Sequence, residues 1–392
     1  MNIGRVILVV ADACGVGEAP DAAQYGDSGS ATVPHVAEAV NGLDMYTCGK
    51  LGLGNIVPIE GVPAANPPIG NYGKLAEKAA GKDSTSGHWE MAGVVLDKPF
   101  PVFPKGFPRD LVEEFERRAG VEVIGNVAAS GTEIIQKLGF AHLETKALIL
   151  YTSADSVFQL AAHERLYPPE RLYEICQTAR ELLQDEYAVG RVIARPFEGE
   201  PGNFKRTRNR RDFSLEPPSD TILDLFVKDN LRTVGIGKIA DLFASRGLTE
   251  KVKTENNRDV AGALIQAVEE TDYDLIFANF VDFDELHGHR NNPIGFARAL
   301  EDFDLAMEEV VEELRPDDML IITADHGCDP TITTSTDHSR EYVPLLVHGR
   351  QLAKGVDLGT RETFADIATT IAEAKGLNHS FPGTSFFREI AK

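Results

Sequence analysis

Short apolar runs alternate with amphipathic segments along most of the chain. Runs that predict buried strands lie at residues 3–10, 147–153, 190–197, 233–236, 273–281, 318–324 and 343–347. Segments that predict helices lie at residues 109–118, 168–185, 239–245, 258–270, 294–314 and 364–374. In the longest of these helices, Phe296, Leu300, Phe303 and Met307 recur at helical spacing. Strands that alternate with helices predict an α/β fold, with a mostly parallel sheet covered by helices on both faces.

Two composition changes divide the chain into a core and an insertion. Four prolines fall between residues 99 and 108, and residues 199–218 are rich in Gly, Pro and Arg. Such stretches mark boundaries between structural units. We therefore expect a core domain built from residues 1–100 and 216–392, with an inserted smaller α/β domain at residues 101–215.

Composition and charge exclude several classes of protein. The chain has 392 residues, 43% of them hydrophobic, and a net charge of −22, which disfavours nucleic acid as a partner. No apolar run is long enough to cross a bilayer, and the start lacks a signal-peptide pattern, so we expect a cytoplasmic protein with no membrane partner. The four cysteines, far apart and without a CxxC pair, argue against a zinc ribbon or a disulfide framework.

Acidic residues and histidines follow three of the predicted strands. Asp12 comes after the first strand, and Asp325-His326 follows the strand at 318–324. The strand at 273–281 runs into Asp282-Phe283-Asp284-Glu285-Leu286-His287-Gly288-His289, which offers several acids and two histidines. A further Asp337-His338 pair comes shortly afterwards. Ligands bind at the carboxyl ends of parallel strands, so these side chains are expected to gather at one edge of the sheet.

Such a group of carboxylates and imidazoles repels itself unless cations neutralise it. Asp and His donors without thiolate suit manganese, zinc or magnesium, and there are enough of them for two ions. Each piece alone has an ordinary explanation, since single histidines on loops are usually hydrogen-bonded surface groups. The combination favours a two-metal site that handles a phosphoryl group.

The stretch at residues 82–90 carries three adjacent hydroxyls, Ser84, Thr85 and Ser86, ahead of a predicted helix. One interpretation is a hydroxyl that caps the helix. The other is a nucleophile, because coordination to a divalent ion lowers the pKa of a hydroxyl and a helix N-terminus holds phosphate. Spacing alone does not choose among the three hydroxyls.

Several motifs together resemble one family. They are Asp12 with Gly15-Val16-Gly17-Glu18-Ala19-Pro20-Asp21, the stretch at 82–90, Ser153-Ala154-Asp155-Ser156-Val157-Phe158-Gln159, Gly202-Asn203-Phe204, Val281-Asp282-Phe283-Asp284 with Gly288-His289-Arg290, and Ala324-Asp325-His326-Gly327 with Thr336-Asp337-His338. In this order, and over essentially the full length, they are similar to the bacterial phosphopentomutases of the alkaline phosphatase superfamily.

The resemblance implies an alkaline-phosphatase-like core with a cap domain, and interconversion of ribose 1-phosphate with ribose 5-phosphate and of the 2-deoxyribose pair. It implies two Mn²⁺ ions, a sugar bisphosphate activator (ribose 1,5-bisphosphate or glucose 1,6-bisphosphate), sugar phosphate substrates and a monomer. Thr85 is implied as the phosphorylated residue, Asp155 as a contact to the sugar, and Arg191 and Lys238 as contacts to its distal phosphate. The implied metal ligands are Asp12, Asp284, His289, Asp325, His326 and His338, with Thr85 beside them.

Rival interpretations remain at this point. The same core is compatible with a metal-dependent phosphomonoesterase or a cofactor-independent phosphoglycerate mutase. A non-catalytic nucleotide-binding module is a third possibility, based on Gly15 and Gly17 or on Gly235-Ile236-Gly237-Lys238. The third glycine of a dinucleotide loop is missing after Gly17, which counts against that module.

Overall fold

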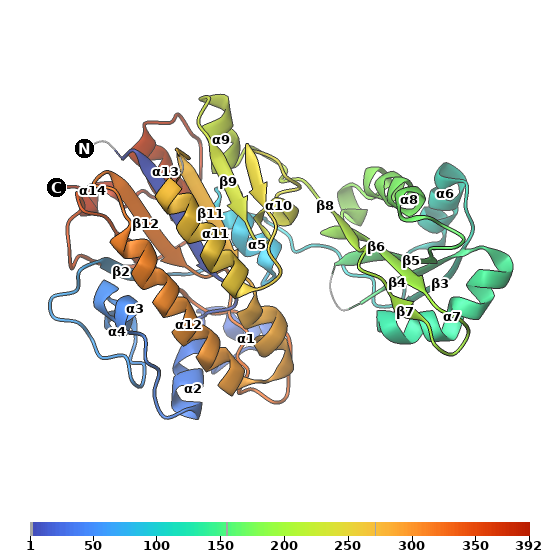
Figure 1. Ribbon diagram of the computed structural model, residues 1–392, viewed down its shortest axis with the longest axis horizontal. Coiled ribbons are helices and arrows are strands. Elements are labelled where there is room, and N and C mark those ends of the chain that lie inside the picture. The colour runs from blue at the N-terminus through green and yellow to red at the C-terminus, as the bar shows by residue number, and fades with distance from the viewer. Residues whose placement is uncertain (1–2, 154–155, 271) are drawn as a thin grey trace. The chain divides into compact units, whose positions relative to one another are not determined.

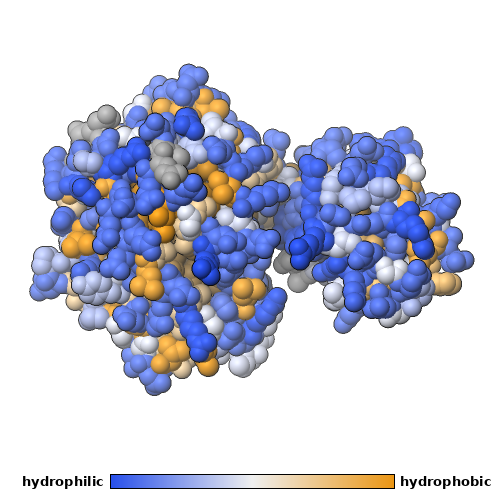
Figure 2. Space-filling model, viewed as in Figure 1, coloured by the Kyte–Doolittle hydropathy of each residue, from blue (hydrophilic) through white to orange (hydrophobic). Residues whose placement is uncertain are grey.

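The computed structural model describes residues 3–153, 156–270 and 272–392. It divides into two compact units, one made of Met1–Pro99 and Pro217–Lys392 and the other of Phe100–Glu216. Each unit has its own sheet. Within the described ranges no helix is long and apolar enough to cross a membrane. Hydrophilic residues cover most of the face seen in Figure 2, as is usual for a surface in water.

The larger unit is organised on a mostly parallel sheet. Its strands are β1 (Arg5–Ala11), β2 (Asn71–Leu75), β9 (Thr233–Ile236), β10 (Glu250–Val252), β11 (Leu275–Phe280), β12 (Asp318–Thr323), β13 (Val343–His348) and β14 (Asp357–Arg361). Their order across the sheet is β10-β9-β11-β1-β12-β13-β2-β14. Only the pairings of β13 with β12 and with β2 are antiparallel among these strands. The predicted fold class is therefore confirmed.

The three strands that end in acidic residues are direct neighbours. β1 lies between β11 and β12 and pairs with both in parallel. Val10 is opposite Asn279 on one side and Thr323 on the other, so the three strands end at the same level. All three are buried along their whole length, as expected for parallel strands covered on both faces.

The helices of this unit form two groups that cover the sheet. One group contains α2, α3, α11 and α12, and the other contains α5, α9, α10 and α13, with contacts inside each group. Figure 1 shows α11 and α12 side by side across the sheet. The helices are α1 (Ala22–Tyr25), α2 (Thr32–Ala39), α3 (Tyr46–Leu51), α4 (Leu53–Ile56), α5 (Ser84–Met91), α9 (Ile222–Lys228), α10 (Ile239–Leu242), α11 (Asn257–Glu270), α12 (Pro293–Glu312), α13 (Ala365–Lys375) and α14 (Phe387–Ile390).

The start and the buried face of α12 follow from its sequence. Asn292 caps it by accepting a hydrogen bond from the Gly295 backbone, and Pro293 occupies the first turn, where it costs no hydrogen bond. The apolar positions seen in the sequence, among them Phe296 and Met307, are fully buried. Burial of each such side chain is worth about 1.5–3 kcal/mol.

The smaller unit has a sheet of its own in the order β3-β4-β5-β6-β7, with β8 paired to β6. Its elements are β3 (Val123–Ala128), β4 (Leu148–Thr152), β5 (Val157–His163), β6 (Arg191–Glu198), β7 (Lys205–Arg206), β8 (Arg211–Ser214), α6 (Arg109–Ala119), α7 (Gly131–Thr145), α8 (Pro169–Leu182) and the 3-10 turn η1 (Asp185–Tyr187). Two apolar clusters fill it, one around Phe115 and Phe158 and one around Phe197 and Phe204. The strand β5 has no counterpart among the strands predicted from the sequence.

Candidate metal centre

Asp12, Asp325 and His326 form a fully buried group at the ends of β1 and β12, which we call the inner group. One donor atom from each lies within 4.8 Å of the others. Nε2 of His326 is 3.5 Å from Oδ1 of Asp12 and 3.4 Å from Oδ2 of Asp325. The backbone N–H of Ala13, a non-glycine residue with φ of 65°, donates to Oδ1 of Asp325 at 3.1 Å. A left-handed residue here is a strained conformation of the kind often found at functional sites.

Asp284, His289 and His338 form a second group, which we call the outer group. Asp284 lies on the π-helical turn η2 (Phe283–His287) after β11, and His289 on the 3-10 turn η3 (Gly288–Arg290). Nε2 of His289 is 3.2 Å and Nε2 of His338 is 3.5 Å from Oδ1 of Asp284. His338 precedes Ser339, which exchanges two backbone hydrogen bonds with Gly327. These two hydrogen bonds bring the end of the long loop after β12 back to the metal centre.

The two groups adjoin through their histidines. The ring of His338 lies 4.2 Å from that of His326 and 4.7 Å from that of His289, between centroids. All six residues proposed from the sequence as metal ligands are therefore brought together in two neighbouring groups of three.

The donor atoms fit divalent cations. Oδ1 of Asp12, Oδ1 of Asp284 and Oδ2 of Asp325 are buried and accept no hydrogen bond from any described residue. His326 and His289 each direct Nδ1 at a backbone carbonyl, that of Gly327 at 3.0 Å and that of Thr336 at 2.5 Å. Metal-binding histidines are usually oriented in this way, with the other ring nitrogen left as a ligand.

The inner group is electrostatically unbalanced. Burial, followed by the charges of Asp325 and Asp284, raises the pKa of Asp12 well above its usual value. Burial also acts to raise the pKa of Asp325, but His326 and His88 outweigh it and lower that pKa to about 2. Two carboxylates share one imidazole of the group, so a proton or a cation is needed to relieve their repulsion.

The outer group is balanced by its own imidazoles. Burial acts to raise the pKa of Asp284, yet His338 and His289 hold it well below its usual value. Burial lowers the pKa of His289, but its close contact with the Asp284 carboxylate raises it to about 11. One carboxylate here faces two imidazoles.

The hydroxyl stretch begins α5, but no hydroxyl caps it. Asp83 is the cap: its Oδ1 accepts from the backbone N–H groups of Thr85 and Ser86. Ser86 completes a capping box with Asp83, because its hydroxyl accepts from the Asp83 backbone N–H, and its side chain is buried. The interpretation of a hydroxyl as the N-cap is therefore replaced by a carboxylate cap: Asp83 reaches these N–H groups and carries the charge that a helix N-terminus favours, while the Ser86 hydroxyl contributes to the capping box.

Two hydroxyls therefore remain available as nucleophiles. Oγ of Ser84 lies 3.2 Å from Nε2 of His326, which places it at the inner group. Thr85 is half-buried beside it.

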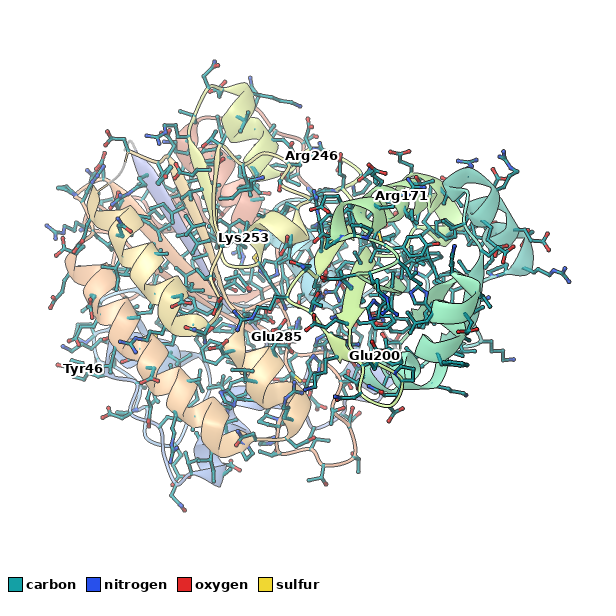
Figure 3. The ribbon with its side chains drawn as sticks, turned by 45° about the vertical axis from the view of Figure 1, so that its right-hand side comes forward. Tyr46, Arg171, Glu200, Arg246, Lys253 and Glu285 are labelled. Carbon is teal, nitrogen blue, oxygen red and sulfur yellow. The ribbon has the colours of Figure 1, made fainter. Side chains whose placement is uncertain are left out.

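The proposed substrate contacts are distributed over both units. Asp155 lies outside the described residues. Arg191 is on β6 of the smaller unit, 3.7 Å from Asp212. Lys238 is in the larger unit and pairs with Glu285 at 2.9 Å (Figure 3 labels Glu285, on η2). Burial lowers the pKa of Lys238, but Asp12 and Glu285 outweigh it and raise that pKa.

The loop at Gly15 and Gly17 is not free for a nucleotide. Oε2 of Glu341 accepts from the Gly17 backbone at 3.2 Å, and a Cβ at Gly15 would meet the same carboxylate. A negative group already occupies the position where a dinucleotide loop holds phosphate.

Two residues at the inner group were not identified from the sequence. His88 and Asn279 are fully buried against Asp325 and Asp12, respectively. His88 stands within the stretch at 82–90, one helical turn after Ser84 and Thr85, and this spacing was the available signal. Asn279 is a single polar residue inside the apolar strand β11, which was a weaker one.

Comparison with known proteins decides the family. The chain matches the metalloenzyme superfamily over residues 4–379. It is 54% identical to a phosphopentomutase of Caldanaerobacter subterraneus subsp. tengcongensis over 387 residues, covering 98% of both chains. It is 56% identical to one of Thermotoga petrophila over 384 residues, covering 97% of this chain and 98% of that one. The chain belongs to the phosphopentomutase family.

Comparison with solved structures shows a shared fold. The PH0037 protein of Pyrococcus horikoshii superposes with a TM-score of 0.51 at 16% identity, covering 98% of this chain and all of that one. Membership of the phosphopentomutase family, an isomerase family, sets aside the interpretations as phosphoglycerate mutase, phosphomonoesterase and nucleotide-binding module.

Proposed function

We propose that this phosphopentomutase-family chain interconverts ribose 1-phosphate and ribose 5-phosphate, and the 2-deoxyribose pair, through a phosphothreonine at Thr85. The observation that carries this proposal is the pair of adjoining donor groups with three buried carboxylate oxygens that no described residue satisfies, next to the hydroxyls that start α5. Near-identical length and 54–56% identity to phosphopentomutases support the choice of reaction.

In this proposal the inner and outer groups each hold one divalent cation, for which we favour Mn²⁺. When bound, the two cations supply charge neutralisation for the phosphoryl oxygens and lower the pKa of the reacting hydroxyl. A sugar bisphosphate is proposed as activator, because Thr85 must carry phosphate before the first turnover. A monomer in the cytoplasm is proposed as the working form.

The residues of the chain then have distinct tasks. Phosphorylated Thr85 passes its phosphoryl group to the free hydroxyl of the sugar monophosphate: its Oγ–P bond breaks, a new O–P bond forms, and the hydroxyl proton is released. The resulting bisphosphate returns its other phosphoryl group to Thr85. We assign contacts with the sugar to Asp155 and with the distal phosphate to Arg191 and Lys238. The smaller unit is proposed as a cap that excludes water, since water would otherwise hydrolyse the phosphoenzyme.

Substitution of the hydroxyls tests the proposal. Thr85→Ala should abolish mutase activity and phosphorylation by a sugar bisphosphate while the six Asp and His ligands still bind Mn²⁺. Ser84→Ala is the matched control and should retain phosphorylation at Thr85, with reduced turnover because its contact to His326 is lost. Coupled assays and phosphopeptide mapping give both readouts. Turnover by Thr85→Ala, with the phosphate found on Ser84, would show that Ser84 is the nucleophile.

A further inference from the structure

His88 connects the start of α5 with the inner group. Its Nδ1 is 2.8 Å from the backbone oxygen of Ser84, which belongs to the peptide unit that joins Ser84 to Thr85. The same nitrogen lies 3.1 Å from Oδ2 of Asp325. At the other side of the ring, Nε2 is 3.3 Å from Nδ2 of Asn279. Asn279 in turn donates from Nδ2 to Oδ2 of Asp12 at 3.0 Å.

Donor and acceptor requirements fix the state of this chain of contacts. The amide Nδ2 of Asn279 only donates, so Nε2 of His88 accepts, and the ring proton resides on Nδ1 and is donated to Ser84. The reversed amide would put its oxygen against the carboxylate of Asp12, where two acceptors would meet. In the orientation shown, Oδ1 of Asn279 is buried and accepts no hydrogen bond from the described residues, which costs free energy. The hydrogen bond to Asp12 is therefore made at the expense of an unsatisfied oxygen.

A permanently charged residue at this position would compete with a cation for Asp12 and Asp325. An imidazole and an amide instead orient the groups around these carboxylates through hydrogen bonds.

We propose that His88 and Asn279 are positioning residues that act as one bridge: Asn279 orients the carboxylate of Asp12, and His88 fixes the Ser84–Thr85 peptide relative to it. The bridge sets the distance between the reacting hydroxyl at the start of α5 and the inner group. The inference rests on the proposed function, because the bridge is proposed to position Thr85 for that reaction.

A double-mutant cycle tests the bridge. His88→Leu and Asn279→Leu should each lower kcat about 10–100-fold and weaken Mn²⁺ binding to the metal-depleted protein by a similar factor, with little change in the KM for ribose 5-phosphate. Since the two residues act through one another, the double variant should lose no more than the worse single variant. Independent packing contributions would instead multiply, and that result would overturn the proposal.

Two further variants distinguish loss of the bridge from a general loss of folding or stability. His88→Asn keeps a donor near the Ser84 oxygen but cuts the contact to Asn279, so it should reproduce the Mn²⁺ affinity of Asn279→Leu even if His88→Leu fails to fold. His142→Leu is the matched control: His142 is a second fully buried histidine, in the smaller unit, with both ring nitrogens bonded to backbone. It should lower the melting temperature and leave Mn²⁺ affinity unchanged.

The outcomes separate the two proposals. Isothermal titration with Mn²⁺ alone should give two sites in the wild-type protein. A wild type that binds no Mn²⁺ would overturn the proposed function and this inference with it. Two wild-type sites together with unchanged Mn²⁺ affinity and kcat in the His88 variants would overturn this inference alone.

Discussion

The inner and outer groups arise at the same edge of one sheet, yet they differ in exposure and in charge. Side chains of the inner group, Asp12, Asp325 and His326, are fully buried. In the outer group only Asp284 is nearly so, at 4% exposure, while His338 is 13% and His289 32% exposed. The inner group has two carboxylates for one imidazole and the outer group has the reverse ratio.

This difference separates two kinds of dependence on a cation. Without one, the outer group forms internal ion pairs, and accordingly the pKa of Asp284 is low and that of His289 is high. The inner group has one imidazole for two carboxylates, so it cannot form such ion pairs for both. Burial and the neighbouring carboxylates therefore raise the pKa of Asp12. We infer that the inner group is tuned for tight cation binding at the expense of metal-free stability, and that the outer group tolerates exchange.

The largest expected difference is in activity. Asp325→Asn should lower kcat at least about a thousandfold, since several kcal/mol of charge stabilisation depend on its carboxylate and each 1.36 kcal/mol is a factor of ten. The matched His289→Asn variant should lose less and regain turnover as Mn²⁺ is raised, because it leaves two ligands at an accessible site. Steady-state kinetics over a Mn²⁺ series measures both. Equal losses with equal rescue would contradict the distinction between the groups.

The next largest effect is on the melting temperature, which should change in opposite directions in two matched variants. In the metal-depleted protein, Asp12→Asn should raise the melting temperature by about 2–4 °C, because it removes a buried carboxylate repelled by Asp325. Asp284→Asn should lower it, because His289 and His338 lose their counter-charge. Calorimetry of metal-depleted proteins measures the two shifts.

Saturating Mn²⁺ provides the control for this pair. A cation that binds only the folded state stabilises it, so both variants should gain less from Mn²⁺ than the wild type does. A fall in melting temperature for metal-depleted Asp12→Asn would show that the inner carboxylates are not in conflict.

The positions of the acids were predictable because strand ends obey a simple rule. Apolar runs located β1, β11 and β12, and parallel neighbours end at one edge, so Asp12, Asp284 and Asp325 could be expected together. His338 lies in a loop without periodicity, so the pair Asp337-His338 could be noted in the sequence, but only the family resemblance indicated His338 as a ligand. Its place depends on the backbone bridge between Gly327 and Ser339, which local sequence does not encode.

Roles within one stretch were less predictable. At residues 83–86 the sequence has one carboxylate followed by three hydroxyls, all of residue types that cap helices. In the structure Asp83 is the cap and Ser86 completes the capping box. The strand β5 is not recognisable as an apolar run, because Gln159 and His163 interrupt it although every residue is buried in the fold. The role of Asn279 could hardly be predicted, because one polar residue in an apolar strand does not indicate which side chain it contacts in the folded protein.

A smaller effect is expected in the rate of cation loss. Excess chelator should remove Mn²⁺ in two phases, the faster from the outer group, because His289 is exposed whereas no inner side chain is. Stopped-flow mixing with a chelator that reports bound Mn²⁺ resolves the phases. His289→Asn should accelerate only the fast phase. A single phase with a stoichiometry of two would mean that the groups release their cations together.

The smallest expected effect, taken per unit of pH, is a pH dependence confined to the metal-depleted protein. The pKa of His289 is raised to about 11, so the stability it contributes is complete below its ordinary value near 6.5 and is lost as the pH rises through about 11. The melting temperature should therefore fall by about 1–3 °C per unit between pH 7 and pH 10. His289→Asn should flatten this slope, because it removes the titrating imidazole. Saturating Mn²⁺ should also abolish the slope, since a bound cation takes the place of the proton at the outer group; a slope that persists with Mn²⁺ would assign it to residues outside both groups.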